Sequence, residues 1–161
     1  MTDVPDDSSR GDADWLRLSQ GETETESLGA ELGRTLRCFD VVYLSGTLGA
    51  GKTAFARGLA RGRSAEPGQA ASPTFALVNE YADASGRIVL RHLDLYRIED
   101  RLRDLESIGV PDALAGAPAA VEWPNDSIRS VLPPTIEVSL TPGPSPETRQ
   151  IQIRRISLPP Q

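Results

Sequence analysis

The fold is decided by Gly46-Thr47-Leu48-Gly49-Ala50-Gly51-Lys52-Thr53, which matches the phosphate-loop pattern G-x-x-x-x-G-K-[S/T]. Glycines in such a loop let backbone N–H groups turn toward phosphate oxygens without a Cβ in the way. Lys52 would reach the β- and γ-phosphates of a nucleotide, and the Thr53 hydroxyl could ligate Mg²⁺. A chain of this composition matches the pattern by chance roughly once in a thousand.

The residues on either side of the loop support the same interpretation. Residues 41–45 form a short β-rich apolar run, typical of a strand buried on both faces. Residues 52–61 carry Phe55 and Leu59 four apart and predict a helix, whose positive end would face the phosphates. The competing interpretation is an ordinary glycine-rich turn. It is disfavoured because Lys52 is the only lysine among 17 basic residues.

The rest of the chain alternates helical and strand patterns. Leucines at four-residue spacing predict an amphipathic helix over residues 23–38, with Thr23 or Thr25 as its N-cap, and a charged helix is predicted over residues 98–108. Further strands are predicted at residues 75–81, 88–93, 119–121, 136–140 and 151–153. This order predicts an α/β fold, a P-loop NTPase-like three-layer sandwich with a small mixed sheet.

Charge divides the chain into two parts. Residues 1–31 hold nine acids and two arginines, a net charge of −7, whereas residues 32–161 hold 14 acids and 15 bases, a net charge of +1. We expect residues 1–18 to form a disordered acidic arm and residues 19–161 a single domain. A nearly neutral domain is not an electrostatic clamp for nucleic acid, so a partner would hold most of any RNA.

Several classes of protein are disfavoured by composition. The longest clean apolar run has four residues, too few for a membrane span, and the acidic start does not resemble a signal peptide. The single cysteine, Cys38, cannot form an internal disulfide. We therefore expect a soluble protein that does not associate with a membrane, most simply in the cytoplasm.

Two acids stand where predicted strands end, on the side where open α/β sheets bind ligands: Asp94 and Glu122. Magnesium bound to phosphates needs a carboxylate of this kind, although each could also be a solvated acid at a strand terminus. Two neighbours have competing interpretations. His92, the only histidine, is interpreted as structural rather than catalytic. Trp123 could stack on a base or a partner, or pack in the core.

Two more segments leave alternatives open. Ser72-Pro73-Thr74 could sense the γ-phosphate through its hydroxyls or could be a plain turn. Arginines 97, 101 and 103 lie among acids, and a solvated helix face of mixed charge is favoured over a binding patch.

Four segments together resemble one family. After the phosphate loop come, in order, Ser72-Pro73-Thr74-Phe75, His92-Leu93-Asp94-Leu95-Tyr96-Arg97 and Val121-Glu122-Trp123-Pro124. Over about residues 20–155 the chain resembles the TsaE family, the ATPase component of bacterial tRNA threonylcarbamoyladenosine biosynthesis. The resemblance implies a P-loop domain that binds ATP and Mg²⁺ and hydrolyses ATP slowly alone. It also implies action with the TsaB–TsaD heterodimer, through which the protein would meet tRNA.

The resemblance also implies roles for individual residues. Thr53 and Glu122 would be the Mg²⁺ ligands, and Lys52 and Asp94 the catalytic residues, with Asp94 at the metal-water shell or the phosphates. The expected nucleotide-binding residues are Glu22, Gly49, Ala50, Gly51, Lys52, Thr53, Ala54 and Arg149. The chain departs from the family at Thr47, where an acid or amide is usual, and at Ala54, where a second threonine is frequent. Neither departure should abolish binding.

Three functions fit these residues. The first is an ATPase subunit of a tRNA-modifying complex, and the second is a small-metabolite kinase that uses the same loop. The third is a module that binds ATP only as a structural ligand. ATP is favoured over GTP because the Asn-Lys-x-Asp element of guanine-specific GTPases would need a second lysine, and Lys52 is the only one.

Overall fold

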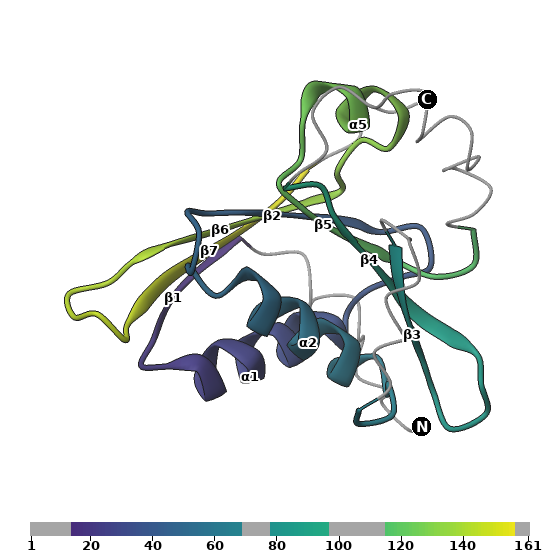
Figure 1. Ribbon diagram of the computed structural model, residues 1–161, viewed down its shortest axis with the longest axis horizontal. Helices are drawn as coiled ribbons and strands as arrows, with labels where there is room; N and C mark the ends of the chain where they lie inside the picture. The colour runs from purple at the N-terminus through teal and green to yellow at the C-terminus, as the bar shows by residue number, and fades with distance from the viewer. Residues whose placement is uncertain (1–13, 69–77, 97–114, 157–161) are drawn as a thin grey trace, which may run out of the picture.

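The computed structural model describes residues 14–68, 78–96 and 115–156, and shows a mixed sheet between two layers of helices (Figure 1). The strands are β1 (Trp15–Ser19), β2 (Val41–Ser45), β3 (Val78–Ala82), β4 (Ile88–Asp94), β5 (Ala119–Glu122), β6 (Ile136–Pro142) and β7 (Arg149–Arg155). The helices are α1 (Glu22–Gly33), α2 (Lys52–Gly62) and α5 (Asp126–Val131). The predicted three-layer α/β fold is therefore confirmed.

The strand order is β1-β7-β6-β2-β5-β4-β3. The central strands β6, β2, β5 and β4 pair in parallel, whereas β1, β7 and β3 add antiparallel pairs toward the edges. Four of the five residues of β2 are buried, as predicted for a strand covered on both faces. Parallel pairing brings the carboxyl ends of β2, β5 and β4 to one edge, because Leu44 and Asp94 both lie opposite Glu122.

The core lies on both faces of the sheet. On one face, Phe55 and Leu59 of α2 pack against apolar side chains of β2, β6 and β7. On the other face, Ile128 of α5 packs against Tyr43 and Val121. The two apolar residues that predicted α2, Phe55 and Leu59, are thus on the face of the helix that is buried against the sheet.

Helices α1 and α2 lie in backbone contact, which the sequence analysis did not predict. A Cβ added at Gly58 would collide with the carbonyl oxygen of Glu26, and one added at Gly62 would collide with that of Ala30. Added Cβ atoms at Gly29 and Gly33 would collide with the backbone of α2 in the same way. The contacts advance along both helices together, so α1 and α2 run parallel, side by side in Figure 1.

Three predictions differ from the structure near the N-terminus. Residues 15–18, assigned to the arm, belong to β1, which is held by backbone pairing with β7 while Leu16 and Leu18 face outward. Helix α1 ends at Gly33 rather than at residue 38. Its N-cap is Gly21, so Thr23 and Thr25 lie within the helix, where the Thr25 hydroxyl shares a hydrogen bond with Ser19 at 2.7 Å.

The remaining differences lie elsewhere in the chain. Helix α5 was not predicted, although Asn125 caps it by accepting a hydrogen bond from the N–H of Ile128 at 2.9 Å. The predicted helix over residues 98–108, the Ser72-Pro73-Thr74 segment and the arginines at 97, 101 and 103 lie outside the described residues. Within the described ranges, no helix has the length and apolar character needed to cross a membrane.

Substituting Gly58 by alanine should destabilise the protein. In an exposed helix this change stabilises by about 0.5–1 kcal/mol, but here the new methyl group has no space beside the Glu26 carbonyl. We expect Gly58→Ala to lower the free energy of unfolding by at least about 2 kcal/mol in urea denaturation. Gly21→Ser is the control, since a Cβ there meets nothing within 4 Å, and it should change stability by less than about 0.5 kcal/mol. Equal stability of Gly58→Ala and wild type would contradict the backbone contact.

Candidate functional site

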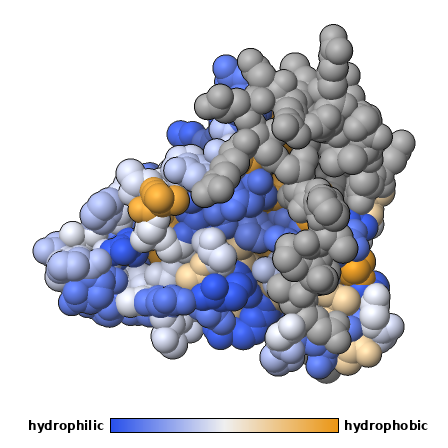
Figure 2. Space-filling model, viewed as in Figure 1, coloured by the Kyte–Doolittle hydropathy of each residue, from blue (hydrophilic) through white to orange (hydrophobic). Residues whose placement is uncertain are grey.

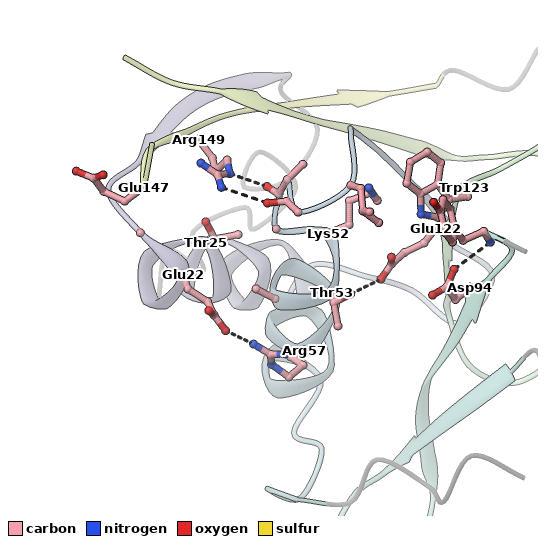
Figure 3. A pocket seen from close by; sticks show the side chains of 17 residues that line it. Glu22, Thr25, Lys52, Thr53, Arg57, Asp94, Glu122, Trp123, Glu147 and Arg149 are labelled. Carbon is pink, nitrogen blue, oxygen red and sulfur yellow. Dashed lines mark hydrogen bonds and ion pairs between the residues drawn. The ribbon is translucent and has the colours of Figure 1, made fainter. Parts of the chain in front are cut away.

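A cavity of about 360 Å³ opens where the central strands end and where α1 and α2 begin (Figure 3). Its volume is in the range of small-molecule binding sites. All ten residues predicted for the site line this one cavity: Glu22, Gly49, Ala50, Gly51, Lys52, Thr53, Ala54, Asp94, Glu122 and Arg149. The structure thus brings together residues that are up to 127 positions apart in the sequence.

The loop backbone presents donors to the cavity. Gly51 is the N-cap of α2 with a left-handed φ of 100°, and Gly46 lies so close to the Leu140 carbonyl that a Cβ would collide with it. The first hydrogen bond of α2 runs from the N–H of Phe55 to the Gly51 carbonyl, at 2.9 Å. The N–H groups at positions 52–54 precede this bond and have no carbonyl within the helix. These groups and the positive helix end form a cradle for an anion.

Lys52 extends its ammonium group along this loop. Its Nζ donates to the carbonyl oxygens of Gly46 and Thr47, at 2.7 and 2.8 Å, and lies 4.0 Å from the centre of the Trp123 ring. Burial lowers the pKa of Lys52, while the negative charges of Glu122 and Asp94 act in the opposite direction. The ammonium group is therefore held at the cavity by carbonyls, carboxylates and a π face together.

Trp123 lines the cavity and also packs against the core cluster around Tyr43 and Val121, so stacking on a base or partner stays a prediction. Its backbone has a left-handed φ of 56°, an unusual conformation for a bulky residue. The ring packs against Tyr96, with centroids 4.8 Å apart, and also contacts Lys52. The Trp123 side chain therefore forms part of the lining of the cavity.

Glu122 is a buried carboxylate at the end of β5. Its Oε1 accepts hydrogen bonds from the Thr53 hydroxyl at 3.1 Å and from Nε2 of His92 at 2.8 Å. Burial would raise the pKa of Glu122. The hydrogen bond and charge of His92, the Thr53 hydroxyl and the charge of Lys52 together bring this pKa below its ordinary value. Glu122 is thus ionised at neutral pH although only 3% of it is exposed.

The donors at this end of the cavity fit a magnesium ion that is also bound by phosphate. A hydroxyl and a carboxylate, Thr53 and Glu122, lie within hydrogen-bond distance of each other. In the part of the chain that the structure describes, no group of three His, Cys, Asp or Glu side chains could hold a metal by itself. Magnesium is usually bound by one or two protein oxygens together with phosphates and water, which is the set that these residues offer.

The other predicted residues surround this centre. Asp94 lies exposed at the end of β4, where its carboxylate accepts the N–H of Tyr96 at 3.1 Å. Glu22 pairs with Arg57 of α2 at 2.6 Å. Arg149 donates to the carbonyls of Gly49 and Ala50, both at 3.1 Å, so that β7 holds the phosphate loop from outside (Figure 3).

Sequence reasoning missed two features of the site. Arg57, one helical turn after Thr53, reaches the cavity, and its spacing along α2 could have indicated this. The contact between His92 and the buried carboxylate of Glu122 was also missed, while the interpretation of His92 as structural rather than catalytic stays a prediction. Only the register of β4 against β5, which the sequence does not reveal, shows that these two side chains meet.

Comparison with known proteins points to one family. The family model described as "Threonylcarbamoyl adenosine biosynthesis protein TsaE" matches residues 19–151. The tRNA threonylcarbamoyladenosine biosynthesis protein TsaE of Treponema pallidum is 38% identical over 125 residues, covering 76% of this chain and 88% of that protein. The protein of the same name from a Nostoc species is 54% identical over 76 residues, covering 47% of this chain. That match spans less than half of the Nostoc protein, 44% of its length.

A solved structure shows the same fold. The crystal structure of YdiB from Bacillus subtilis superposes with a TM-score of 0.67, covering 90% of this chain and 87% of that one. The two sequences are 23% identical, so this likeness concerns the fold alone.

The pKa of Lys52 can be measured without interference, because it is the only lysine in the chain. A sample labelled with ¹³C at lysine gives one set of side-chain resonances, whose pH titration should give a pKa below that of an ordinary lysine. Glu122→Gln removes a charge that raises this pKa and should lower it further. The control Glu66→Gln, which lies outside the cavity, should leave it unchanged. A higher pKa in Glu122→Gln would contradict the electrostatic description of the site.

Proposed function

The chain belongs to the TsaE family, and from this we propose that it is an ATPase subunit required for threonylcarbamoyladenosine modification of tRNA. It binds ATP with Mg²⁺ in the cavity, hydrolyses ATP slowly alone and acts with a heterodimer of the TsaB–TsaD type. One observation carries the ATP part of the proposal. The N–H groups at positions 52–54, which have no acceptor within α2, the Lys52 ammonium group and the Thr53–Glu122 pair all belong to residues that line a single cavity.

Each residue has a role in this proposal. The N–H groups at positions 52–54 bind phosphate oxygens, and Lys52 leaves its loop carbonyls to bind the β- and γ-phosphates. Thr53 and Glu122 hold Mg²⁺, which offsets charge on the phosphates when it is bound. Asp94, exposed at the next strand end, is placed to orient water near the metal and the γ-phosphate.

The arginine contacts explain why hydrolysis would be slow without a partner. Charge on the transferred phosphoryl group is commonly neutralised by an arginine that reaches into the site. Two arginines line the cavity among the described residues, and both are engaged. Arg57 pairs with Glu22 and Glu26, and Arg149 donates to loop carbonyls. Among the described residues, the site would therefore gain a cation only if one of these two arginines were released, and a partner could supply one instead.

The contribution of Lys52 to nucleotide binding can be measured directly. Lys52→Ala removes a charged donor to phosphate, which should weaken ATP affinity by about 1.5–3 kcal/mol, or roughly 10- to 150-fold in Kd. Titration calorimetry in magnesium buffer gives this value. Arg87→Ala, which removes a cation from the exposed β3–β4 turn, is the matched control and should bind ATP like wild type. Equal affinity of Lys52→Ala and wild type would contradict the proposed site.

Partner dependence separates the proposed function from its alternatives. With γ-labelled ATP, wild type should release free phosphate slowly, and faster when a TsaB–TsaD pair is added. Lys52→Ala should show no such stimulation. A labelled small-molecule product in the presence of candidate acceptors would instead indicate a kinase. ATP binding without turnover, even with the pair present, would indicate a module that uses ATP only as a structural ligand.

A further inference from the structure

The proposed mechanism leaves one buried polar pair unexplained, formed by His92 on β4 and Glu122 on β5. Both residues are almost fully buried, with 4% and 3% of their surfaces exposed. Nε2 of His92 lies 2.8 Å from Oε1 of Glu122. A charged carboxylate taken out of water is costly unless hydrogen bonds compensate, so the donors around Glu122 determine where its oxygens lie.

The sheet register places this pair beneath α2. Strands β4 and β5 are parallel, with His92 opposite Ala120 and Asp94 opposite Glu122. Alternate residues of a strand face the same side, so His92 and Asp94 share one face of β4. Ala120, two residues before Glu122, belongs to the core cluster that contains Phe55 of α2. The imidazole therefore approaches the carboxylate from within the protein, on the side away from the opening of the cavity.

Glu122 has two donors that differ in their relation to a metal. The Thr53 hydroxyl donates to Oε1 at 3.1 Å, and its oxygen would also ligate Mg²⁺ while its proton stays available to the carboxylate. His92 is not among the residues that line the cavity. Its N–H donates to Oε1 at 2.8 Å and has no role as a metal ligand, so it can hold the carboxylate independently of the ion.

The packing around His92 favours a fixed ring. The Tyr81 ring of β3 stacks on the imidazole, with centroids 6.5 Å apart and planes inclined by 28°. Strand β3 pairs with β4, and Asn79 lies opposite His92 in that pair. The ring thus has Tyr81 of β3 on one side and Glu122 of β5 as its hydrogen-bond partner, which favours a fixed orientation of Nε2.

We propose that His92 is a positioning residue that holds the Glu122 carboxylate in the orientation that receives the nucleotide-bound Mg²⁺. The inference rests on the proposed function, because it assigns His92 a role in the same site. Carboxylates and histidines that orient metal ligands typically change metal affinity or activity by 10- to 100-fold when they are removed. His92 would act through Glu122 and would not touch the metal or the phosphates.

Two amide variants test this role because they differ mainly in reach. Glutamine at position 92 can place its amide nitrogen near the position of the imidazole Nε2, whereas asparagine is one methylene shorter and cannot reach Glu122. The measurement is the Kd of a fluorescent ATP analogue, with Mg²⁺ and with EDTA. The ratio of the two Kd values gives the contribution of the metal to binding. His92→Leu is a third variant that removes all polar contact.

The expected results concern this ratio. In His92→Asn and His92→Leu the Mg²⁺ contribution should fall by roughly 10-fold or more, whereas His92→Gln should stay within about 3-fold of wild type. The Kd in EDTA should stay within about 3-fold of wild type in all three, which also shows that the variants are folded. Arg87→Ala, in the exposed β3–β4 turn, is the control and should keep the wild-type ratio.

The contradicting results are distinct from a failure of the proposed function. If His92→Asn keeps the wild-type ratio, or if His92→Gln loses as much as His92→Asn, the positioning role is wrong while ATP binding stands. A wild type that binds the analogue equally well with and without Mg²⁺ would overturn the inference and the magnesium part of the proposed function, but not nucleotide binding. A wild type that binds no analogue under either condition would overturn the proposed function and the inference with it.

Discussion

Parallel pairing of β2, β5 and β4 is the constraint on which the site depends. It brings the phosphate loop after β2, Glu122 after β5 and Asp94 after β4 to the same edge of the sheet. The helix that follows the loop begins there, so its unpaired N–H groups face the same space as the two carboxylates. Most of the coloured surface in Figure 2 is hydrophilic with scattered apolar residues, whereas the large apolar side chains of β2 and α2 are buried under this edge.

The electrostatics of the site follow from the glycine contact between α1 and α2. The two helices run parallel with their backbones touching, so their dipoles align unfavourably and both positive ends lie at the cavity. Glu22 and Glu24 in the first turn of α1 partly offset this concentration of positive potential, whereas the first turn of α2 has no acid. A bound polyphosphate would offset the repulsion between the two positive helix ends. The close packing of α1 and α2 therefore favours an anion at this site.

Elements whose structure is determined by their side-chain pattern could be predicted from the sequence. Elements whose structure is determined by contacts between backbones could not. The apolar run of β2, the loop and the stripe of α2 were predictable, and so were Asp94 and Glu122, because polar residues at strand ends of an α/β sheet meet at one edge. Strand β1 was missed because it is held by hydrogen bonds to β7 while Leu16 and Leu18 remain exposed. The helix contact was missed because glycines within a helix suggest only a weak helix until the partner is seen. The contact of His92 with Glu122 was missed because a lone histidine has no motif.

The start of α2 is the proposed binding site for a triphosphate, and a crystal structure of the protein with Mg²⁺ and a non-hydrolysable ATP analogue tests this most directly. We predict phosphate oxygens within hydrogen-bond distance of the N–H groups of Lys52, Thr53 and Ala54. We also predict that the Lys52 ammonium group contacts the β- and γ-phosphates and that Mg²⁺ lies beside the Thr53 hydroxyl and Glu122. A nucleotide bound elsewhere, or a triphosphate that leaves Lys52 on the carbonyls of Gly46 and Thr47, would contradict the proposed site.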